Sequence, residues 1–192
     1  MGAVAVSVER WADLVEDFTT FFEHLVSIVR RHLGKQFDTE GGYASGGWDE
    51  LLPAYAAWKE ENFPGRPILV LTGALRSAAV DGGPGSLERI QPRLLEVGVD
   101  GEAIPYARAH QAGEGVPQRP VFEVTNDFRD VVVRLYHAFV VWARKSAMDV
   151  DDPFLDERFE SRMEMIAASS TGDESALEAV FRAGMAAFGS AP

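Results

Sequence analysis

Residues 11–33 read WADLVEDFTTFFEHLVSIVRRHL and give the first indication of the fold. Apolar residues recur in this stretch at spacings of three and four, the period of one helix face. The face is broad and rich in aromatic rings, as in helices that lie across a sheet or against another subunit. Gly34 predicts the end of the helix. The face comprises Trp11, Leu14, Val15, Phe18, Phe21, Phe22, Leu25, Ile28, Val29 and Leu33.

A second long helix is predicted to begin near Asn126, whose short polar side chain can accept a hydrogen bond from the first turn. Its apolar face comprises Phe128, Val131, Val132, Leu135, Phe139 and Trp142. Between the two helices, short apolar runs bounded by Gly and Pro predict strands. The runs are 68–71, 75–80, 94–99 and 121–124, of which the first could instead close a loop. Together they predict an α+β fold, a small antiparallel sheet flanked by two long amphipathic helices.

A loop and a short helix are expected between the first helix and the strands. Residues 37–47 contain four glycines, which predicts a loop. The short helix should end before Pro64. Its apolar side comprises Trp48, Leu51, Leu52, Tyr55 and Trp58.

Acidic residues are concentrated in the last quarter of the chain. Residues 146–192 hold ten Asp and Glu against three Arg, a net charge of −7, whereas residues 1–145 hold twenty acids against fifteen bases, a net charge of −5. This asymmetry predicts an α+β domain over 1–145 and an acidic helical C-terminal extension over 146–192. Two short helices are expected in the extension, near 154–166 and 177–188. The first should present an exposed stripe of Phe154, Phe159 and Met163.

The overall composition is typical of a soluble globular protein, with 46% apolar and 25% charged residues. The chain has no cysteine, which excludes a disulfide framework and a thiolate metal site. It has neither a membrane-spanning stretch nor a secretory leader, so synthesis and residence in the cytoplasm are expected. The net charge of −12 argues against general nucleic-acid binding, although an acidic wall can still line a passage for DNA.

A search for catalytic and metal-binding patterns predicts no enzyme, no cofactor and no metal. Ser45 lacks the leading glycine of a nucleophile elbow, because Tyr43 stands in its place. The loop at 82–85 lacks the Lys-Ser/Thr of a phosphate-binding loop. His110 and Glu114 supply at most two metal ligands. A small hydrolase that uses His110 with a nearby carboxylate remains an alternative.

Four segments in order form a more specific pattern. They are Gly46-Gly47-Trp48 with Leu51 and Lys59; Ile68-Leu69-Val70-Leu71-Thr72-Gly73-Ala74-Leu75-Arg76-Ser77; Val97-Gly98-Val99 with Pro105-Tyr106-Ala107-Arg108-Ala109-His110-Gln111-Ala112-Gly113; and Val116-Pro117-Gln118-Arg119-Pro120-Val121-Phe122. In order and spacing the chain resembles the phage virion morphogenesis family, the tail-completion proteins of Mu-like and related phages. With its flanking helices, the resemblance extends over about residues 9–145.

The resemblance implies a structural virion protein at the junction of tail and head. Such a protein completes or terminates the tail as a homo-oligomeric ring, expected to be a hexamer. It contacts the tail tube protein on one side and the head-side connector or stopper protein on the other. No membrane and no specific nucleic acid are implied, although DNA passes through the ring. A DNA-contacting adaptor in the same neck is a second alternative.

The motif residues also have physical roles of their own. Thr72 and Gly73 can turn the chain tightly, and Arg119 can bridge to a carboxylate in a fork. His110 and Gln111 can donate and accept hydrogen bonds on a loop, next to an amphipathic Tyr106. Two interpretations stay open: these residues brace loops, or they contact a neighbouring subunit. The full predicted set is Trp48, Thr72, Gly73, Leu75, Arg76, Tyr106, His110, Gln111, Arg119 and Phe122.

Overall fold

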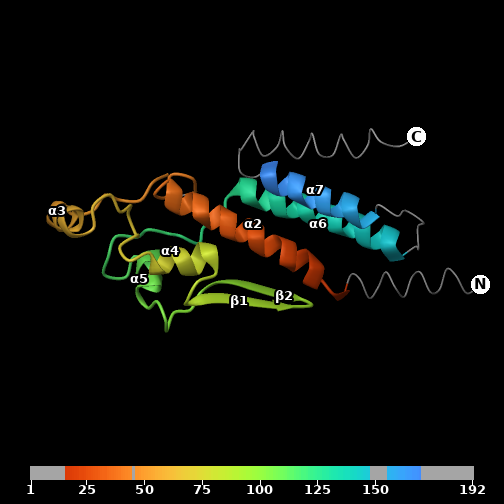
Figure 1. Cartoon of the computed structure of the whole chain (residues 1–192), viewed down its shortest axis with the longest axis horizontal. Coiled ribbons are helices and arrows are strands. Elements are labelled where there is room, and N and C mark those ends of the chain that lie inside the picture. The colour runs from red at the N-terminus through yellow and green to blue at the C-terminus, as the bar shows by residue number, and fades with distance from the viewer. Residues whose placement is uncertain (1–15, 45, 148–154, 170–192) are drawn as a thin grey trace, which may run out of the picture. The chain divides into compact units, whose positions relative to one another are not determined.

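The computed structural model describes residues 16–44, 46–147 and 155–169 (Figure 1). It confirms an α+β fold with long helices and one small two-stranded sheet. The elements are α2 (Thr19–Asp38), α3 (Pro53–Asn62), α4 (Ala74–Arg76), the π-helical turn η1 (Ser77–Asp81), β1 (Ser86–Gln91), β2 (Leu94–Val99), α5 (Tyr106–Ala112), α6 (Asn126–Ala147) and α7 (Leu155–Ser169).

The chain divides into two compact units. One, here called the helical unit, contains, among the described residues, 16–25, the hairpin tip at 91–94, 126–147 and 155–169. The other, the sheet unit, contains residues 26–90 and 95–125. Helix α2 therefore contributes its first turns to one unit and the remainder to the other. The predicted boundary between residues 145 and 146 is not where the units divide, and it stays a prediction.

Helix α2 confirms the predicted apolar face from Phe21 onward, but the predicted continuity from Trp11 is wrong: Asp17 and Phe18 are not helical, and the Asp17 carboxylate accepts the Thr19 N–H at 2.8 Å where α2 begins. Phe21, Leu25, Ile28 and Leu33 are all buried. The predicted stop at Gly34 is wrong, because the helix continues for another turn to Asp38. That turn buries Phe37 almost completely, which offsets the weak helix propensity of glycine.

The helical unit is held together by aromatic rings. The indole ring of Trp142 on α6 stacks on Phe159 of α7 at 4.7 Å, and its N–H group donates to Asp156 at 2.9 Å. The α7 helix confirms the first predicted helix of the extension. However, the expected exposed stripe is wrong, since Phe159 and Met163 are buried. Phe154 and the second predicted helix at 177–188 lie outside the described residues.

The sheet unit is less regular than predicted. Its strands are β1 and β2, joined by a tight turn at Pro92–Arg93. The 94–99 run predicts β2 correctly, whereas no predicted run covers β1. Residues 68–71 form turns, with Leu69 at a φ of 60°. Residues 75–80 are helical, because Leu75, Ala78 and Ala79 bury one face at helical spacing. Residues 121–124 form no strand.

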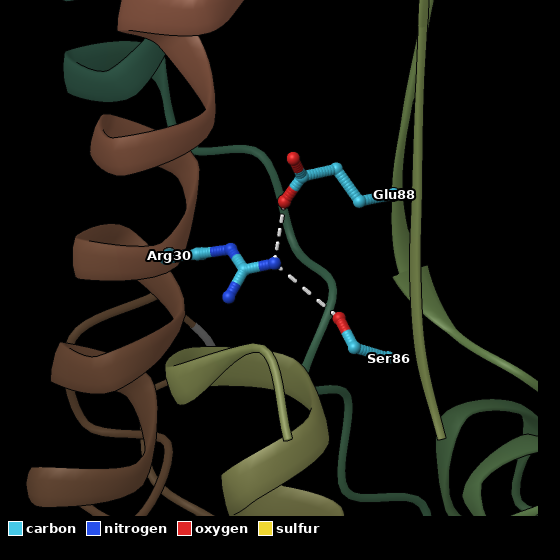
Figure 2. Close-up of polar contacts among 3 residues, drawn as sticks. All are labelled: Arg30, Ser86 and Glu88. Carbon is cyan, nitrogen blue, oxygen red and sulfur yellow. Dashed lines mark hydrogen bonds and ion pairs between the residues drawn. The ribbon is translucent and has the colours of Figure 1, made fainter. Parts of the chain in front are cut away.

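An ion pair joins α2 to β1 within the sheet unit (Figure 2). One terminal nitrogen of Arg30 donates to Glu88 at 2.6 Å and lies 3.4 Å from the Ser86 hydroxyl. Gly82, at a φ of 69°, allows this arrangement, since a Cβ atom there would overlap the Arg30 guanidinium. The core beside this pair consists of Leu33, Phe37, Trp48, Val70, Leu75, Ala78, Ala79, Ile104 and Val121.

Candidate functional site

All ten predicted motif residues lie in the sheet unit. Several of them meet at the irregular segment 113–125, between α5 and α6. This segment has no strand partner, so its buried backbone groups need hydrogen bonds from side chains. The structure supplies them mainly from α2, α5 and Trp48. We call residues 119–123, where these bonds gather, the braced loop.

Gln111 makes the most extensive contact with the braced loop. It lies on helix α5 and not on a loop as expected, because Gly113 at a φ of 76° ends the helix only after Ala112. Its side-chain oxygen accepts the N–H groups of Val121 at 2.9 Å and Phe122 at 3.0 Å. Its side-chain nitrogen donates to the Phe122 carbonyl at 3.2 Å. One glutamine side chain thus replaces a strand partner.

The carbonyl of Pro120 accepts two further hydrogen bonds. The Trp48 indole N–H donates to it at 3.1 Å, and the fully buried Gln36 donates at 3.0 Å. Gln36 also accepts the N–H of Ala44 at 3.0 Å, which ties the glycine-rich loop to α2. One turn earlier, His32 contacts the Glu123 carbonyl at 2.6 Å. Phe122 packs, half-buried, against the core cluster.

Arg119 is buried and directed at backbone oxygens. Its guanidinium donates to the Asp49 carbonyl at 3.0 and 3.1 Å and to the Glu50 carbonyl at 3.2 Å. Its backbone N–H donates to the His110 carbonyl at 2.8 Å. The expected fork is therefore present, but carbonyl groups receive it in place of a carboxylate. This contact fixes the segment that leads into α3.

His110 is partly buried beside these groups. Burial and the nearby positive charge of Arg119 lower the pKa of the His110 ring, and a hydrogen bond with the Pro117 backbone opposes them. Its Nδ1 atom is buried and has no hydrogen-bond partner among the described residues. Tyr106 lies edge-on to the ring at 6.4 Å and is partly exposed. The lowered pKa favours a neutral imidazole at pH 7.

The Thr72–Ser77 segment confirms the predicted tight turn but lies apart from the braced loop contacts. Gly73 has a φ of 88°, and the Thr72 hydroxyl lies 3.4 Å from the Ala74 N–H. Leu75 is buried in the core. Arg76 donates to Asp38 at 3.1 Å across a partly exposed surface, which restrains the end of α2.

A second buried cation was not predicted. Lys59 on α3 is only 4% exposed, and its ammonium group donates to the Pro67 carbonyl at 2.5 Å. Burial lowers the pKa of Lys59, while the Glu40 carboxylate opposes this effect. Glu40 itself accepts the N–H of Ile68 at 2.6 Å. Lys59 thus holds the loop that follows α3, as Arg119 holds the segment that precedes it.

The side of α3 that faces inward carries Lys59, and its apolar side lies at the surface. Leu52 is 72% exposed, Tyr55 43% and Trp58 44%. The Tyr55 and Trp58 rings stack on one another at 5.6 Å with an interplanar angle of 22°. Of the predicted apolar side, only Trp48 is buried in the core.

The described residues contain no group of three or more His, Asp or Glu side chains that is arranged to bind a metal ion. No helix in this part of the chain is long and apolar enough to cross a membrane. Comparison with protein-family models, curated protein sequences and solved structures finds no match to the chain.

Proposed function

We propose that the protein is a structural subunit of the phage tail-completion type, which acts through its surfaces and not through a reactive group. In this proposal it assembles as a homo-oligomeric ring, a hexamer, at the junction of tail and head. The ring contacts the tail tube on one side and the head-side connector or stopper on the other, and DNA passes through it. The protein resides in the host cytoplasm during assembly and afterwards in the virion.

One observation carries this proposal: two polar motif residues, Gln111 and Arg119, have their side chains engaged with the backbone of their own chain. Gln111 and Arg119, which carry much of the motif's chemistry, donate to and accept from backbone groups at 2.9 to 3.2 Å. Groups engaged in this way hold a shape, and they are poorly placed to bind or activate a substrate. A family signature built from such residues favours a structural role.

The outward side of the same unit supports association. Arg119 and Lys59 hold α3 by its flanking segments, while Leu52, Tyr55 and Trp58 remain exposed. Clusters of exposed apolar side chains mark interaction sites on soluble proteins. Aromatic residues on a rigid element are effective anchors, because little side-chain freedom is lost on binding.

The test is the size and location of the protein. Light scattering of the purified chain should give a large oligomer, alone or after addition of tail tube protein, and negative-stain images should show rings. Antibody labelling should place the chain at the neck of virions. A stable monomer that is absent from particles, yet turns over a small molecule and loses this activity in His110→Ala, would replace the proposal with the hydrolase alternative.

A further inference from the structure

Helix α3 has an inverted orientation: it buries its lysine and exposes its aromatic residues. In an ordinary surface helix the lysine faces water and the rings face the core. Here Lys59 is buried against the Pro67 carbonyl, while Tyr55 and Trp58 stack side by side at the surface. Leu52, immediately before the helix, is the most exposed large apolar residue among those described. We call Leu52, Tyr55, Trp58 and Glu61 the α3 surface.

The charge around the α3 surface is of one sign. Asp49, Glu50, Glu60 and Glu61 are all exposed. The only basic residue between 48 and 62 is Lys59, which is buried. A complementary partner therefore needs exposed apolar groups accompanied by cations and free of carboxylates.

The exposed face of α6 has these properties from Val133 onward, whereas its first turns carry the exposed Asp127 and Asp130. Val133 and Val141 are 51% and 55% exposed, and their spacing of eight residues places them on one side of the helix. Residues 133–145 contain no Asp or Glu. Exposed cations accompany the two valines along this stretch. We call Val133, Arg134, His137, Val141, Arg144 and Lys145 the α6 stripe.

We infer that the α3 surface of one copy docks on the α6 stripe of a second copy. This inference rests on the proposed function and deepens it by naming the surfaces through which copies meet. Because the two surfaces differ, the contact is heterologous, and repeated head-to-tail contacts produce a closed ring or a filament. The stacked rings pack against the valines, and the rim of acids faces the cations.

Segments of the same chain are weaker matches for the α3 surface. Residues 1–15 hold two acids and one base, and residues 170–192 hold three acids and one base, so both carry net negative side-chain charge. The α6 stripe instead carries three Arg or Lys and no acid. The charge balance therefore favours the stripe as the occupant.

Charge-swapped variants test the contact. Glu61→Arg places a cation on the α3 surface, and Arg144→Glu places an acid on the α6 stripe. Each variant alone should self-associate at least about tenfold more weakly than the wild type, since like charges then face one another. An equimolar mixture should recover the wild-type affinity to within about threefold, because each variant supplies the surface that the other needs. Sedimentation velocity measures all four samples.

Matched controls separate this contact from general charge effects. Glu102→Arg and Arg162→Glu make the same changes at exposed positions outside both surfaces and should leave self-association unchanged. If both swapped variants associate like the wild type, or if mixing restores nothing, the docking is overturned while the ring proposal stands. A wild type that stays monomeric up to about 1 mM overturns the docking as well. The proposed function itself fails only if the chain is absent from particles.

Site-specific crosslinking gives an independent test, because the chain has no native cysteine. Ala57 is exposed on α3 one turn before Glu61, at the edge of the α3 surface. A mixture of Ala57→Cys and Val141→Cys should form a crosslinked heterodimer with a short bifunctional maleimide. Each variant alone should form little. Crosslinks between two copies of Ala57→Cys indicate an isologous contact and overturn the inference. The inference is also overturned if the double variant, which carries Ala57→Cys and Val141→Cys in one chain, forms crosslinks only within single chains.

Discussion

The braced loop and helix α3 lie in the same unit but satisfy their backbone hydrogen bonds in opposite ways. The loop at 119–123 has no regular hydrogen bonding, so the side chains of Gln36, Trp48 and Gln111 supply its hydrogen bonds. Helix α3 satisfies its own backbone, so its aromatic side chains are free to face outward. An irregular segment is here the buried part, and a regular helix is the exposed one.

This contrast shows where rigidity and recognition come from in the protein. Buried polar side chains fix the loop, since an unsatisfied backbone group in the interior costs free energy. Arg119 belongs to the loop and also reaches the carbonyls before α3, so the rigid part holds the exposed part in place. Substitutions in the loop should therefore lower stability, whereas substitutions on α3 should alter association.

The largest effect is expected for Gln111→Leu. The leucine fills a similar volume but leaves two N–H groups and one carbonyl of the braced loop without partners. Each buried group left unpaired costs about 1 to 3 kcal/mol, so the free energy of unfolding should fall by at least about 3 kcal/mol. Urea denaturation followed by circular dichroism measures the change.

Gln118→Leu is the matched control for this prediction. Gln118 is exposed and makes one 3.2 Å bond to the Gln111 carbonyl, so its replacement should cost less than about 1 kcal/mol. Equal losses in the two variants would mean that the braced loop does not depend on its glutamine.

Arg119→Lys should have the next largest effect. Lysine keeps the charge but cannot present a planar fork to the Asp49 and Glu50 carbonyls. We expect a loss of about 2 kcal/mol in unfolding free energy, together with faster amide hydrogen exchange in α3. Arg108→Lys, at an exposed position, should change neither quantity. Unchanged exchange in α3 would show that Arg119 does not hold the helix.

The long helices could be predicted from the sequence, because they depend on a local pattern. The period of three to four residues identifies α2 and α6 directly. The same period is present at Leu75, Ala78 and Ala79, but the run is short and was interpreted as a strand. Runs of this length do not distinguish a strand from a helical segment. At 68–71, Leu69 adopts a positive φ that an apolar pattern does not reveal.

The inward-facing polar residues were only partly predictable. Gln111 and Arg119 were found through the family resemblance, not through their contacts. Gln36 follows Leu33 by three residues and so lies on the buried side of α2. This spacing could have predicted its burial, but a search for apolar periodicity passes over a polar residue. Its partner, Pro120, is 84 residues away in the sequence. Pro64-Gly65 predicts the turn after α3, but no local pattern predicts that the Pro67 carbonyl accepts a hydrogen bond from the buried Lys59.

A smaller, pH-dependent effect is expected from His110. Its folded-state pKa is lowered, so between that pKa and the unfolded value of about 6.5 the unfolded chain binds more protons. Stability should be complete above pH 6.5 and fall as the solution becomes more acidic. His32, whose pKa burial also lowers, should add to this fall. In His110→Gln, the loss of unfolding free energy between pH 7 and 5.5 should be smaller than in the wild type. The difference should be less than about 1 kcal/mol, because solvent reaches the ring and weakens the effect. An unchanged loss would mean that this ring does not contribute.

The smallest effect on stability should come from Leu52→Ser, which tests the exposed side of the comparison. With 72% of the side chain in solvent, the substitution removes little buried apolar area, so the unfolding free energy should change by no more than about 0.5 kcal/mol. The same change at Leu75, which is buried in the core, should cost about 3 kcal/mol or more. Denaturation measures both variants, and light scattering measures their self-association. Weaker association of Leu52→Ser at unchanged stability separates recognition from folding, whereas a loss of stability as large as at Leu75 would show that α3 packs inward after all.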